Sequence, residues 1–465
     1  MNMINVRRLT VMTFLGASML SGISAQVSPL QVDTLKETKI PDQWDLQSCI
    51  DYAKEQNITI RKNRITAAST QIDVKTAKAA LFPSLSFSTG HQVVNRPYQE
   101  TSSRVSGSEI ISSNSKTSYN GNYGLNASWT LYNGNKRLKT IQQEKLNNQM
   151  AELDVATSEN NIQESIAQVY IQILYAAESV KVNENTLQVS IAQRDRGQEL
   201  LNAGSIAKSD LAQLEAQVST DRYQLVTAQA TLEDYKLQLK QLLELDGENE
   251  MNIYLPALSD ENVLAPLPTK RDVYISALSL RPEIEASKLN VEASELGINI
   301  AKSSYFPTIS LSAGIGTNHT SGSDFTFGEQ VKNGWNNSIG LSVSMPIFNN
   351  RQTKSAVQKA KLQYETSMLS LLDEQKALYK TIESLWLDAN SAQQRYAAAN
   401  EKLKSTQISY ELISEQFNLG MKNTVELLTE KNNLLQAQQE QLQAKYMAIL
   451  NTQLLKFYQG DQLAL

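Results

Sequence analysis

The sequence is poor in residues that bind metals or form disulfides: its 465 residues include one cysteine and two histidines. A single cysteine, Cys49, excludes an internal disulfide, and two histidines are too few for a zinc centre. We interpret His91 and His319 as solvated residues near strand ends or loop tips. The sequence also lacks a glycine-rich phosphate loop, a GxSxG elbow and an HExxH motif. We therefore expect no metal site, no cofactor and no enzyme.

Long apolar runs are also lacking, because no stretch of about 18 apolar residues follows residue 25 to make a transmembrane helix. The chain starts with a basic pair at Arg7, a mostly apolar run over 9–23 and the small residues Ser24-Ala25. This order is typical of a secretory signal peptide, here 1–25. A membrane anchor is the alternative, although the apolar run is short for a bilayer. If the remaining chain enters a membrane, it must do so with strands.

Basic residues are not in excess, since the formal net charge is -5. No basic surface is therefore expected, and nucleic acid is not a predicted partner. Hydrophobic residues make up 41% of the chain, and Gln, Asn, Ser and Ala are common. This composition favours long helices with narrow apolar stripes.

The sequence ALFPSLSFSTG at 80–90 returns as SYFPTISLSAG at 304–314. In both copies a helical pattern stops at a Phe-Pro pair, and apolar and polar residues then alternate. Because proline cannot continue a helix and disfavours helical geometry in the residue before it, each copy predicts a helix followed by a strand. The chain is thus predicted to contain two similar halves, with opening helices at 44–80 and 272–303.

Each junction leads into a predicted β-hairpin with one apolar and one polar face. The hairpin tips, about 91–118 and 317–335, are rich in Ser, Thr, Asn and Gly and are expected to be exposed loops. Soluble sheets also have such strands, but the signal peptide and the aromatic residues near the strand ends favour an apolar face toward lipid. Four strands cannot close a barrel, so the chain is expected to oligomerise. The aromatic residues are Tyr119, Tyr123, Trp129 and Trp335.

Beyond each hairpin a long helical pattern ends at a glycine and turns back. From about 137 to 201 the pattern predicts a continuous helix of roughly 100 Å, and 382–417 carries a heptad seam. The turns read AGSIAKSDL and LGMKNTVEL, with Gly204 and Gly420 at matching positions. The first return helix has an apolar seam that Asp221 interrupts. Each half is therefore predicted to contain an antiparallel helical hairpin.

The predicted boundaries follow from these repeats, and a connector with three prolines joins the halves. The segments are a signal peptide at 1–25, a polar segment at 26–43, a first repeat at 44–246 with a β-hairpin at 84–132 and a helical turn at 202–207, a connector at 247–269, a second repeat at 270–457 with a β-hairpin at 308–348 and a helical turn at 418–423, and a C-terminal tail at 458–465.

Together these features resemble the outer-membrane efflux protein family, the TolC-like tunnels, from about residue 44 to 457. The resemblance rests on RPEI at 281–284, the paired Phe-Pro junctions, the SxPIFN strand end and the two glycine turns, in this order and at duplicated spacing. It implies a mixed α and β membrane protein with an internal duplication. Long antiparallel helical hairpins would form an α-barrel, and four strands per chain would contribute to the twelve-stranded transmembrane β-barrel of a homotrimer in outer-membrane lipid.

The resemblance also implies partners and site residues. A periplasmic adaptor would dock on the helical turns and link the tube to an inner-membrane pump, such as an RND or ABC transporter. The alternative is that the glycines only end helices. The docking residues would be Ala203, Gly204, Ser205, Leu419, Gly420 and Met421.

The family closes its periplasmic mouth with inward acidic residues beyond the second turn. Glu426 matches the first of these positions, but the second is Thr429, with Glu430 beside it. This departure leaves one of the two family positions without an acidic residue, which bears on the charge of the gate and on its cation affinity. For Glu426, a partner of the helix dipole in the first turn is an equal alternative.

The expected function is passive conduction from an inner-membrane pump to the cell exterior, through the outer-membrane channel of a tripartite efflux or type I secretion system. A rival is a surface-anchored coiled-coil adhesin or structural envelope protein, which would place the helical turns outside the cell. An envelope hydrolase has no catalytic constellation to support it. The sequence does not distinguish drugs, metals, peptides and proteins as cargo.

Overall fold

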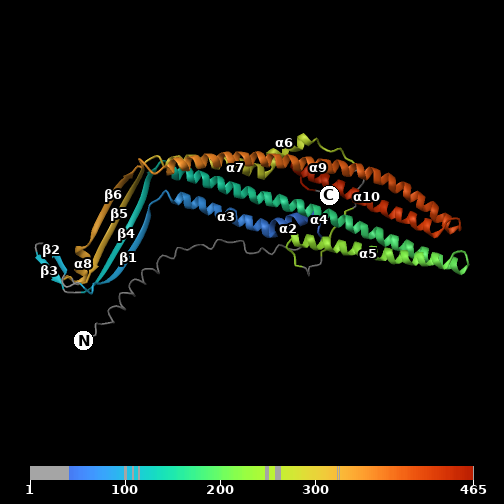
Figure 1. Ribbon diagram of the computed structural model, residues 1–465, viewed down its shortest axis with the longest axis horizontal. Helices are drawn as coiled ribbons and strands as arrows, with labels where there is room; N and C mark the ends of the chain where they lie inside the picture. Colours follow the sequence, from blue (N-terminus) through green and yellow to red (C-terminus); the bar gives the residue numbers. More distant parts are fainter. Residues whose placement is uncertain are drawn as a thin grey trace, which may run out of the picture. The chain divides into compact units, whose positions relative to one another are not determined.

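The computed structural model describes residues 41–98, 102–106, 109–113, 116–246, 251–256, 263–321, 323 and 325–463. The proposed signal peptide, and the polar segment up to residue 40, lie outside these ranges. Residues Gln43–Leu465 form one compact unit, the second of the two into which the chain divides. All the helices and strands named below belong to the second unit (Figure 1).

Each half of this unit begins with two helices, continues into strands and ends with two long helices. The first half contains α2 (Leu46–Gln56), α3 (Ile58–Ala79), β1 (Ser84–Asn95), β2 (Ser102–Ser106), β3 (Glu109–Ser113), β4 (Thr117–Asn133), α4 (Lys136–Asn202) and α5 (Lys208–Leu242). The second contains α6 (Lys270–Leu280), α7 (Pro282–Ser303), β5 (Thr308–Thr320), α8 (Phe327–Asn333), β6 (Asn336–Ser344), α9 (Gln352–Asn418) and α10 (Thr424–Gln459).

The opening helix of each half is broken, where the sequence pattern predicted one continuous helix. Asn57 leaves helical geometry with ψ 126°, and its side chain accepts hydrogen bonds from the N–H groups of Thr59 and Ile60. In the second half, Pro282 occupies the first turn of α7. An N-cap asparagine and an N-terminal proline both start a new helix. The prediction of single helices was wrong for this reason.

The Phe-Pro junctions lie where proline was expected to end the helix. β1 begins at Ser84 and β5 at Thr308, each directly after its proline. Trp129 of β4 donates its indole N–H to the carbonyl oxygen of Leu81 at 2.7 Å, which ties the strand to the junction. β6 ends at Ser344, before Pro346, where the alternation predicted strand up to Ile347. Proline has no N–H to donate to a sheet, so the ladder stops there.

The hairpin tips contain regular structure and are not only loops. β2 and β3 pair with each other in the first tip. In the second tip, α8 starts with a capping box in which the N–H of Thr326 donates to Glu329 Oε2 at 2.8 Å. Such a box stabilises even a short helix start. The expectation of plain exposed loops was therefore wrong.

The main sheet is antiparallel, with the strand order β1-β4-β5-β6. Even-numbered residues pair with even-numbered residues over most of its length, for example Asn126 with Ser86 and Gly314. Since side chains alternate between faces, one face carries the polar residues and the other the apolar ones. Both faces are solvent-exposed in the single chain: Ile339 is 84% exposed, and every residue of β6 is exposed.

The long helices α4 and α9 have 67 residues each, which corresponds to roughly 100 Å. α4 packs against α5 and α9 against α10, so each half has an antiparallel hairpin, and α10 also packs against α4. A buried cluster that includes Trp44, Tyr170 and Leu239 forms the main core. Within the described ranges, no helix has the length and apolar character needed to cross a bilayer.

Candidate functional site

The turn between α4 and α5 is built around Gly204, whose backbone is left-handed with φ +75°. The N–H of Gly204 donates to the carbonyl oxygen of Leu201 at 2.9 Å, and the N–H of Ser205 to that of Leu200 at 2.8 Å. This pairing is a Schellman helix end, which favours glycine because of its positive φ. A Cβ at Gly204 would meet no atom within 4 Å. Glycine is therefore required for its backbone and not for close packing.

The turn between α9 and α10 has the same geometry. Gly420 has φ +76°, and the N–H groups of Gly420 and Met421 donate to the carbonyl oxygens of Phe417 and Gln416 at 2.9 and 2.8 Å. Here the side chains of Leu419 and Met421 are 75% and 70% exposed. Both turns lie at the ends of the hairpins that are remote from the sheet (Figure 1). The second turn thus presents an exposed apolar pair.

All six residues predicted to dock a partner are exposed in these two turns. Ala203 and Leu419 are the C-caps of α4 and α9, and the glycines and the residues after them complete the turns. They are Ala203, Gly204, Ser205, Leu419, Gly420 and Met421.

The helices that follow the turns begin with acidic residues that bond to the backbone. Asp210 Oδ2 accepts the N–H of Ala207 at 3.0 Å. Asn423 and Glu426 form a capping box, in which Asn423 Oδ1 accepts the N–H of Glu426 at 2.9 Å and Glu426 Oε2 accepts the N–H of Asn423 at 3.2 Å. Glu426 therefore has the helix-start geometry that the alternative interpretation expected.

Glu426 is also paired with a cation. Lys422 Nζ lies 2.6 Å from Glu426 Oε1, and this hydrogen bond, together with the N–H of Asn423, holds the pKa of Glu426 below its usual value. Thr429 donates its hydroxyl to the carbonyl oxygen of Val425 in its own helix at 2.8 Å. The structure thus brings Glu426 together with Lys422 and not with Thr429.

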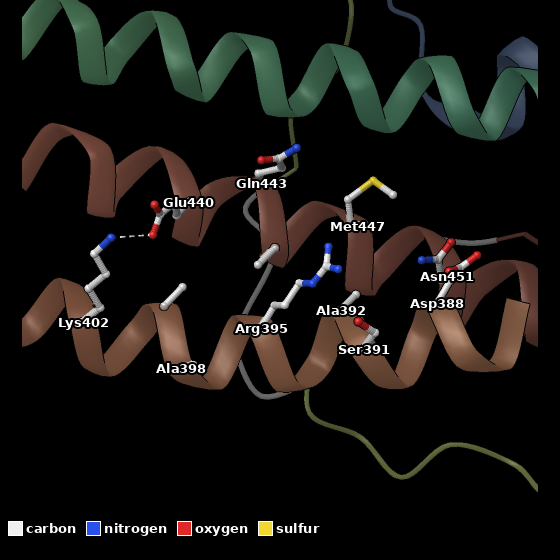
Figure 2. Close-up of a pocket in the computed structure, with 12 residues that line it drawn as sticks. Asp388, Ser391, Ala392, Arg395, Ala398, Lys402, Glu440, Gln443, Met447 and Asn451 are labelled. Carbon is white, nitrogen blue, oxygen red and sulfur yellow. Dashed lines mark hydrogen bonds and ion pairs between the residues drawn. The ribbon is translucent and has the colours of Figure 1, made fainter. Parts of the chain in front are cut away.

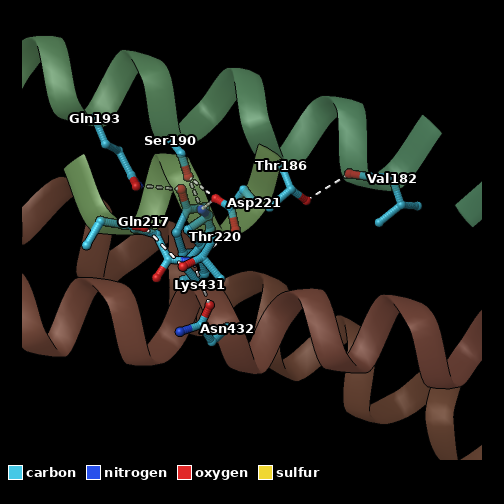
Figure 3. A network of polar contacts seen from close by, with 11 residues as sticks. Val182, Thr186, Ser190, Gln193, Gln217, Thr220, Asp221, Lys431 and Asn432 are labelled. Carbon is cyan, nitrogen blue, oxygen red and sulfur yellow. Dashed lines mark hydrogen bonds and ion pairs between the residues drawn. The ribbon is translucent and has the colours of Figure 1, made fainter. Parts of the chain in front are cut away.

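A buried polar network joins the two helical hairpins (Figure 3). Lys431 of α10 donates to Asp221 of α5 and to Ser190 of α4, and Ser190 also donates to Asp221. All three residues are at least 96% buried. Gln217 adds a hydrogen bond to Asp221 Oδ1 at 2.9 Å. Burial lowers the pKa of Lys431, and its hydrogen bond to Asp221 opposes this shift.

The sequence carried a partial signal for this network. Asp221 interrupts the apolar seam of its helix, which marks it as a charge on a packed face. Lys431 follows Leu428 by three positions and precedes Leu435 by four, so it lies on the apolar face of α10. That these residues meet depends on the packing of three helices, which no local pattern specifies.

A second ionic cluster forms around the arginine of the RPEI motif. Arg281 contacts Glu164 of α4 and Glu283 of α7, each at 2.8 Å, and its guanidinium lies 4.0 Å from the ring centroid of Tyr458 in α10. Burial raises the pKa of Glu164, and the charge of Arg281 opposes this shift. This cluster ties α4, α7 and α10 together.

A cavity of about 570 Å³ lies along the second hairpin, between α9 and α10 (Figure 2). An ion pair between Lys402 Nζ and Glu440 Oε2, 2.7 Å apart, closes one side of it. Its walls combine small and polar side chains. They are Asp388, Ser391, Ala392, Arg395, Ala398, Ala399, Lys402, Glu440, Gln443, Ala444, Met447 and Asn451.

The two histidines lie in strands and share a neighbour. His91 of β1 and His319 of β5 both pair with Gly121 of β4. The ring of Tyr119 lies 5.7 Å from each imidazole, and its hydroxyl is 2.6 Å from His91 Nδ1. They belong to an aromatic group at the α8 end of the apolar face. Both lie in strands and not in loops, and His91 is exposed while His319 is partly buried.

Each half of the chain contributes strands to the exposed sheet and continues into one helical hairpin. Solved outer-membrane channels share this fold. The CusC channel superposes with a TM-score of 0.76 at 19% identity, over 90% of this chain and 92% of that one. VceC from Vibrio cholerae gives a TM-score of 0.73 at 16% identity, over 90% and 97%.

The sequence matches the outer membrane efflux protein family over residues 49–244 and 273–460, and the chain belongs to this family. Its localisation is accordingly the outer membrane. It is 24% identical to the outer membrane efflux protein BepC of Brucella suis, over 63% of this chain and 61% of that protein. It is also 24% identical to TolC of Escherichia coli, over 61% of this chain and 58% of that protein. The matched regions thus span about three fifths of these two relatives.

Another similar protein aligns over more of its length: the toxin and drug export protein A of Aggregatibacter actinomycetemcomitans is 22% identical, over 89% of this chain and 87% of that protein. By name, these proteins are an outer membrane efflux protein, an outer membrane protein and an export protein, and the CusC structure is described as a transmembrane channel.

Proposed function

We propose that this protein is the outer-membrane channel of a tripartite efflux or type I secretion system. It passively conducts substrates from an inner-membrane pump and a periplasmic adaptor to the cell exterior. The observation that carries the proposal is the four-stranded sheet with one apolar face and one polar face, both exposed in the single chain. Such a sheet is stable between lipid and water and would aggregate elsewhere.

The apolar face has the height of a bilayer core. Tyr119 and Trp129 lie ten positions apart in β4, which is about 34 Å along a strand and about 26 Å at a tilt of roughly 40°. Leu125 and Ala127 lie between them on the same face. Aromatic residues at both edges of an apolar band are typical of strands that cross the outer membrane.

Three copies of the chain complete the channel. β1 and β6 are the edge strands of the sheet, and unpaired edges in a membrane require partners. Four strands from each subunit of a homotrimer give a twelve-stranded barrel in outer-membrane lipid. The two repeats, 44–246 and 270–457, then each supply one helical hairpin to an α-barrel in the periplasm.

The helical turns are the docking surface for the periplasmic adaptor, which links the channel to an RND or ABC pump. Exposed Leu419 and Met421, on either side of Gly420 with its left-handed backbone, support this assignment. Glu426 and Thr429 lie at the periplasmic gate. Because Glu426 is held by Lys422, this gate carries less free negative charge than a ring of unpaired carboxylates.

Deletion of the gene, followed by measurement of drug susceptibility and secreted protein, tests the proposed function. Loss of export, restored by the intact gene, supports it. Unchanged drug susceptibility and an unchanged set of secreted proteins would argue against a channel. The same strain shows which cargo class the protein conducts.

Protease access to the turns separates the channel from a surface adhesin. A cleavage site inserted after Ser205 should be protected in intact cells and cut once the outer membrane is permeabilised. Cleavage in intact cells would favour the adhesin, which places the helical hairpins outside.

A further inference from the structure

The polar face of the main sheet has a uniform composition. Every second residue in 84–92, 118–128, 308–320 and 336–344 is serine, threonine, asparagine, glutamine or glycine. The register places these even-numbered residues on one face across all four strands. Along these four ranges, the face therefore consists of hydroxyl groups, amide groups and bare backbone. Beyond them, Val94 of β1 is an apolar residue on the same face, opposite Ser118.

Asparagine side chains lie against glycines on this face. A Cβ at Gly90 would lie 2.6 Å from Asn122 Oδ1, and a Cβ at Gly314 would lie 3.3 Å from Asn126 Oδ1. The amide of each asparagine therefore occupies the place where the neighbouring residue's side chain would stand. Because the glycines leave this space free, the amides remain close to the sheet.

The same arrangement recurs with smaller groups. Ser338 Oγ lies 3.0 Å from the Cβ position of Gly314, and Asn126 Nδ2 lies 3.5 Å from Ser88 Oγ. These contacts fill the polar face with a thin layer of neutral dipoles. Charged rings are the usual source of ion selectivity in pores, and this layer contributes only groups that hydrogen-bond to water.

We infer that the polar face is a thin, neutral lining that does not sort cargo by charge, so the cargo class is hydrophilic molecules of either charge. This inference rests on the proposed function, in which the polar face meets the aqueous path. Asn122 and Asn126 determine this property, since both lie near the middle of β4 and extend over adjacent strands. The contact of Asn122 with Gly90 keeps the amide close to the sheet and so leaves the aqueous path wider. The neutral amides leave the lining without charge.

Ion selectivity in planar bilayers tests the charge part. The purified protein is reconstituted, and the K⁺ to Cl⁻ permeability ratio is measured from reversal potentials under a KCl gradient. The permeability ratio of the intact protein should lie between the ratios of the two variants Asn126→Asp and Asn126→Lys. These variants should shift the ratio in opposite directions, each on the order of threefold or more, because three like charges would face a lining without countercharge. Asn126→Ser is the neutral control and should leave the ratio unchanged.

The charge outcomes are separable. If the intact protein is as selective as either charged variant, or if the charged variants leave the ratio unchanged in a conducting protein, the inference is wrong. If the protein forms no channels at all, the proposed function itself fails.

Conductance tests the width part. In Gly90→Ala the new methyl group would displace the Asn122 amide away from the sheet, so single-channel conductance should fall. Gly316→Ala is the matched control, because its Cβ would have only ordinary contacts of 3.5 Å or more. Equal conductance in the two variants would overturn the role of the Gly90–Asn122 pair.

Discussion

Lys431 of α10 and Asp221 of α5 form an ion pair that is almost completely buried, at 4% and 1% exposure. The pair crosses from one helical hairpin to the other, and Ser190 of α4 binds both partners. Removing one partner of such a pair leaves an uncompensated charge in a packed interior, which is more costly than the loss of the pair as a whole.

We expect Asp221→Asn to destabilise the protein by about 3–5 kcal/mol. The ammonium group of Lys431 would then be buried without a countercharge. Urea unfolding in detergent, followed by circular dichroism, measures the shift in midpoint. Asp221→Leu combined with Lys431→Met should recover most of the loss, because apolar residues of similar size need no countercharge.

An exposed ion pair supplies the control for this prediction. Glu401 and Lys404 lie 2.8 Å apart on the surface of α9, and Glu401→Gln should change stability by less than about 1 kcal/mol. If Asp221→Asn reduced stability no more than Glu401→Gln, the buried pair would contribute no more to stability than the exposed pair.

Substitutions at the turn glycines should show whether export depends on the backbone geometry of the turns. In Gly204→Val, a β-branched residue must adopt φ +75°, a conformation that costs such a residue at least about 1–2 kcal/mol. We expect export to be impaired while the protein still inserts into the outer membrane. Gly204→Asn should retain more export, because asparagine tolerates this conformation.

Export assays at matched protein levels measure this difference. Normal export in Gly204→Val would show that export does not depend on the backbone shape of this turn. Gly420→Val should behave in the same way, since its turn has the same hydrogen bonds.

The thiol of Cys49 provides a pH-dependent prediction. Burial raises its pKa from 9.0 to about 12. In the folded protein it should resist alkylation by iodoacetamide from pH 7 to 10, and it should react readily in urea. Since the unfolded thiol ionises near 9 and the folded one stays protonated, its contribution to stability should decline as the pH rises above 9. Cys49→Ala should remove this part of the pH dependence, and rapid labelling of the folded protein would contradict the burial.

Parts of the fold could be predicted because they depend on single residues. Proline cannot continue a helix, so Pro83 and Pro307 predict where the strands start. Gly204 and Gly420 permit a left-handed backbone, so they predict the helical turns. The alternation after each proline likewise gives the two faces of the sheet. These constraints act within a few residues and are visible in a single sequence.

Other parts were missed although their signal is local, or they depend on contacts between distant segments. The capping box of α8 is local, because it joins Thr326 to Glu329, three positions apart, inside a segment whose composition suggested a loop. The meeting of Asp221 with Lys431 requires three helices to pack in one register. The pairing of Glu426 with Lys422 was within reach, because the two residues lie four positions apart on consecutive turns.

Gly134 lies at the junction between β4 and α4, with φ +66°. A Cβ there would lie 2.6 Å from the carbonyl oxygen of Ser303 and 2.9 Å from Phe306 Cβ. The corresponding position of the second half, Asn350, also has a positive φ, of 49°, so the turn itself accepts asparagine. What distinguishes Gly134 is the close approach of the second Phe-Pro junction.

We therefore expect Gly134→Asn to be much more harmful than Gly204→Asn, although both glycines have left-handed backbones. At Gly134 the overlap with Ser303 and Phe306 should cost about 1–3 kcal/mol, because a packed junction must shift. At Gly204 the added side chain meets no atom within 4 Å. Thermal unfolding of both purified variants, with the amount of each in the outer membrane, measures the difference. Equal stability of the two variants would mean that the junction between the halves can shift without loss of stability. Glycine would then be needed at position 134 only for its backbone conformation.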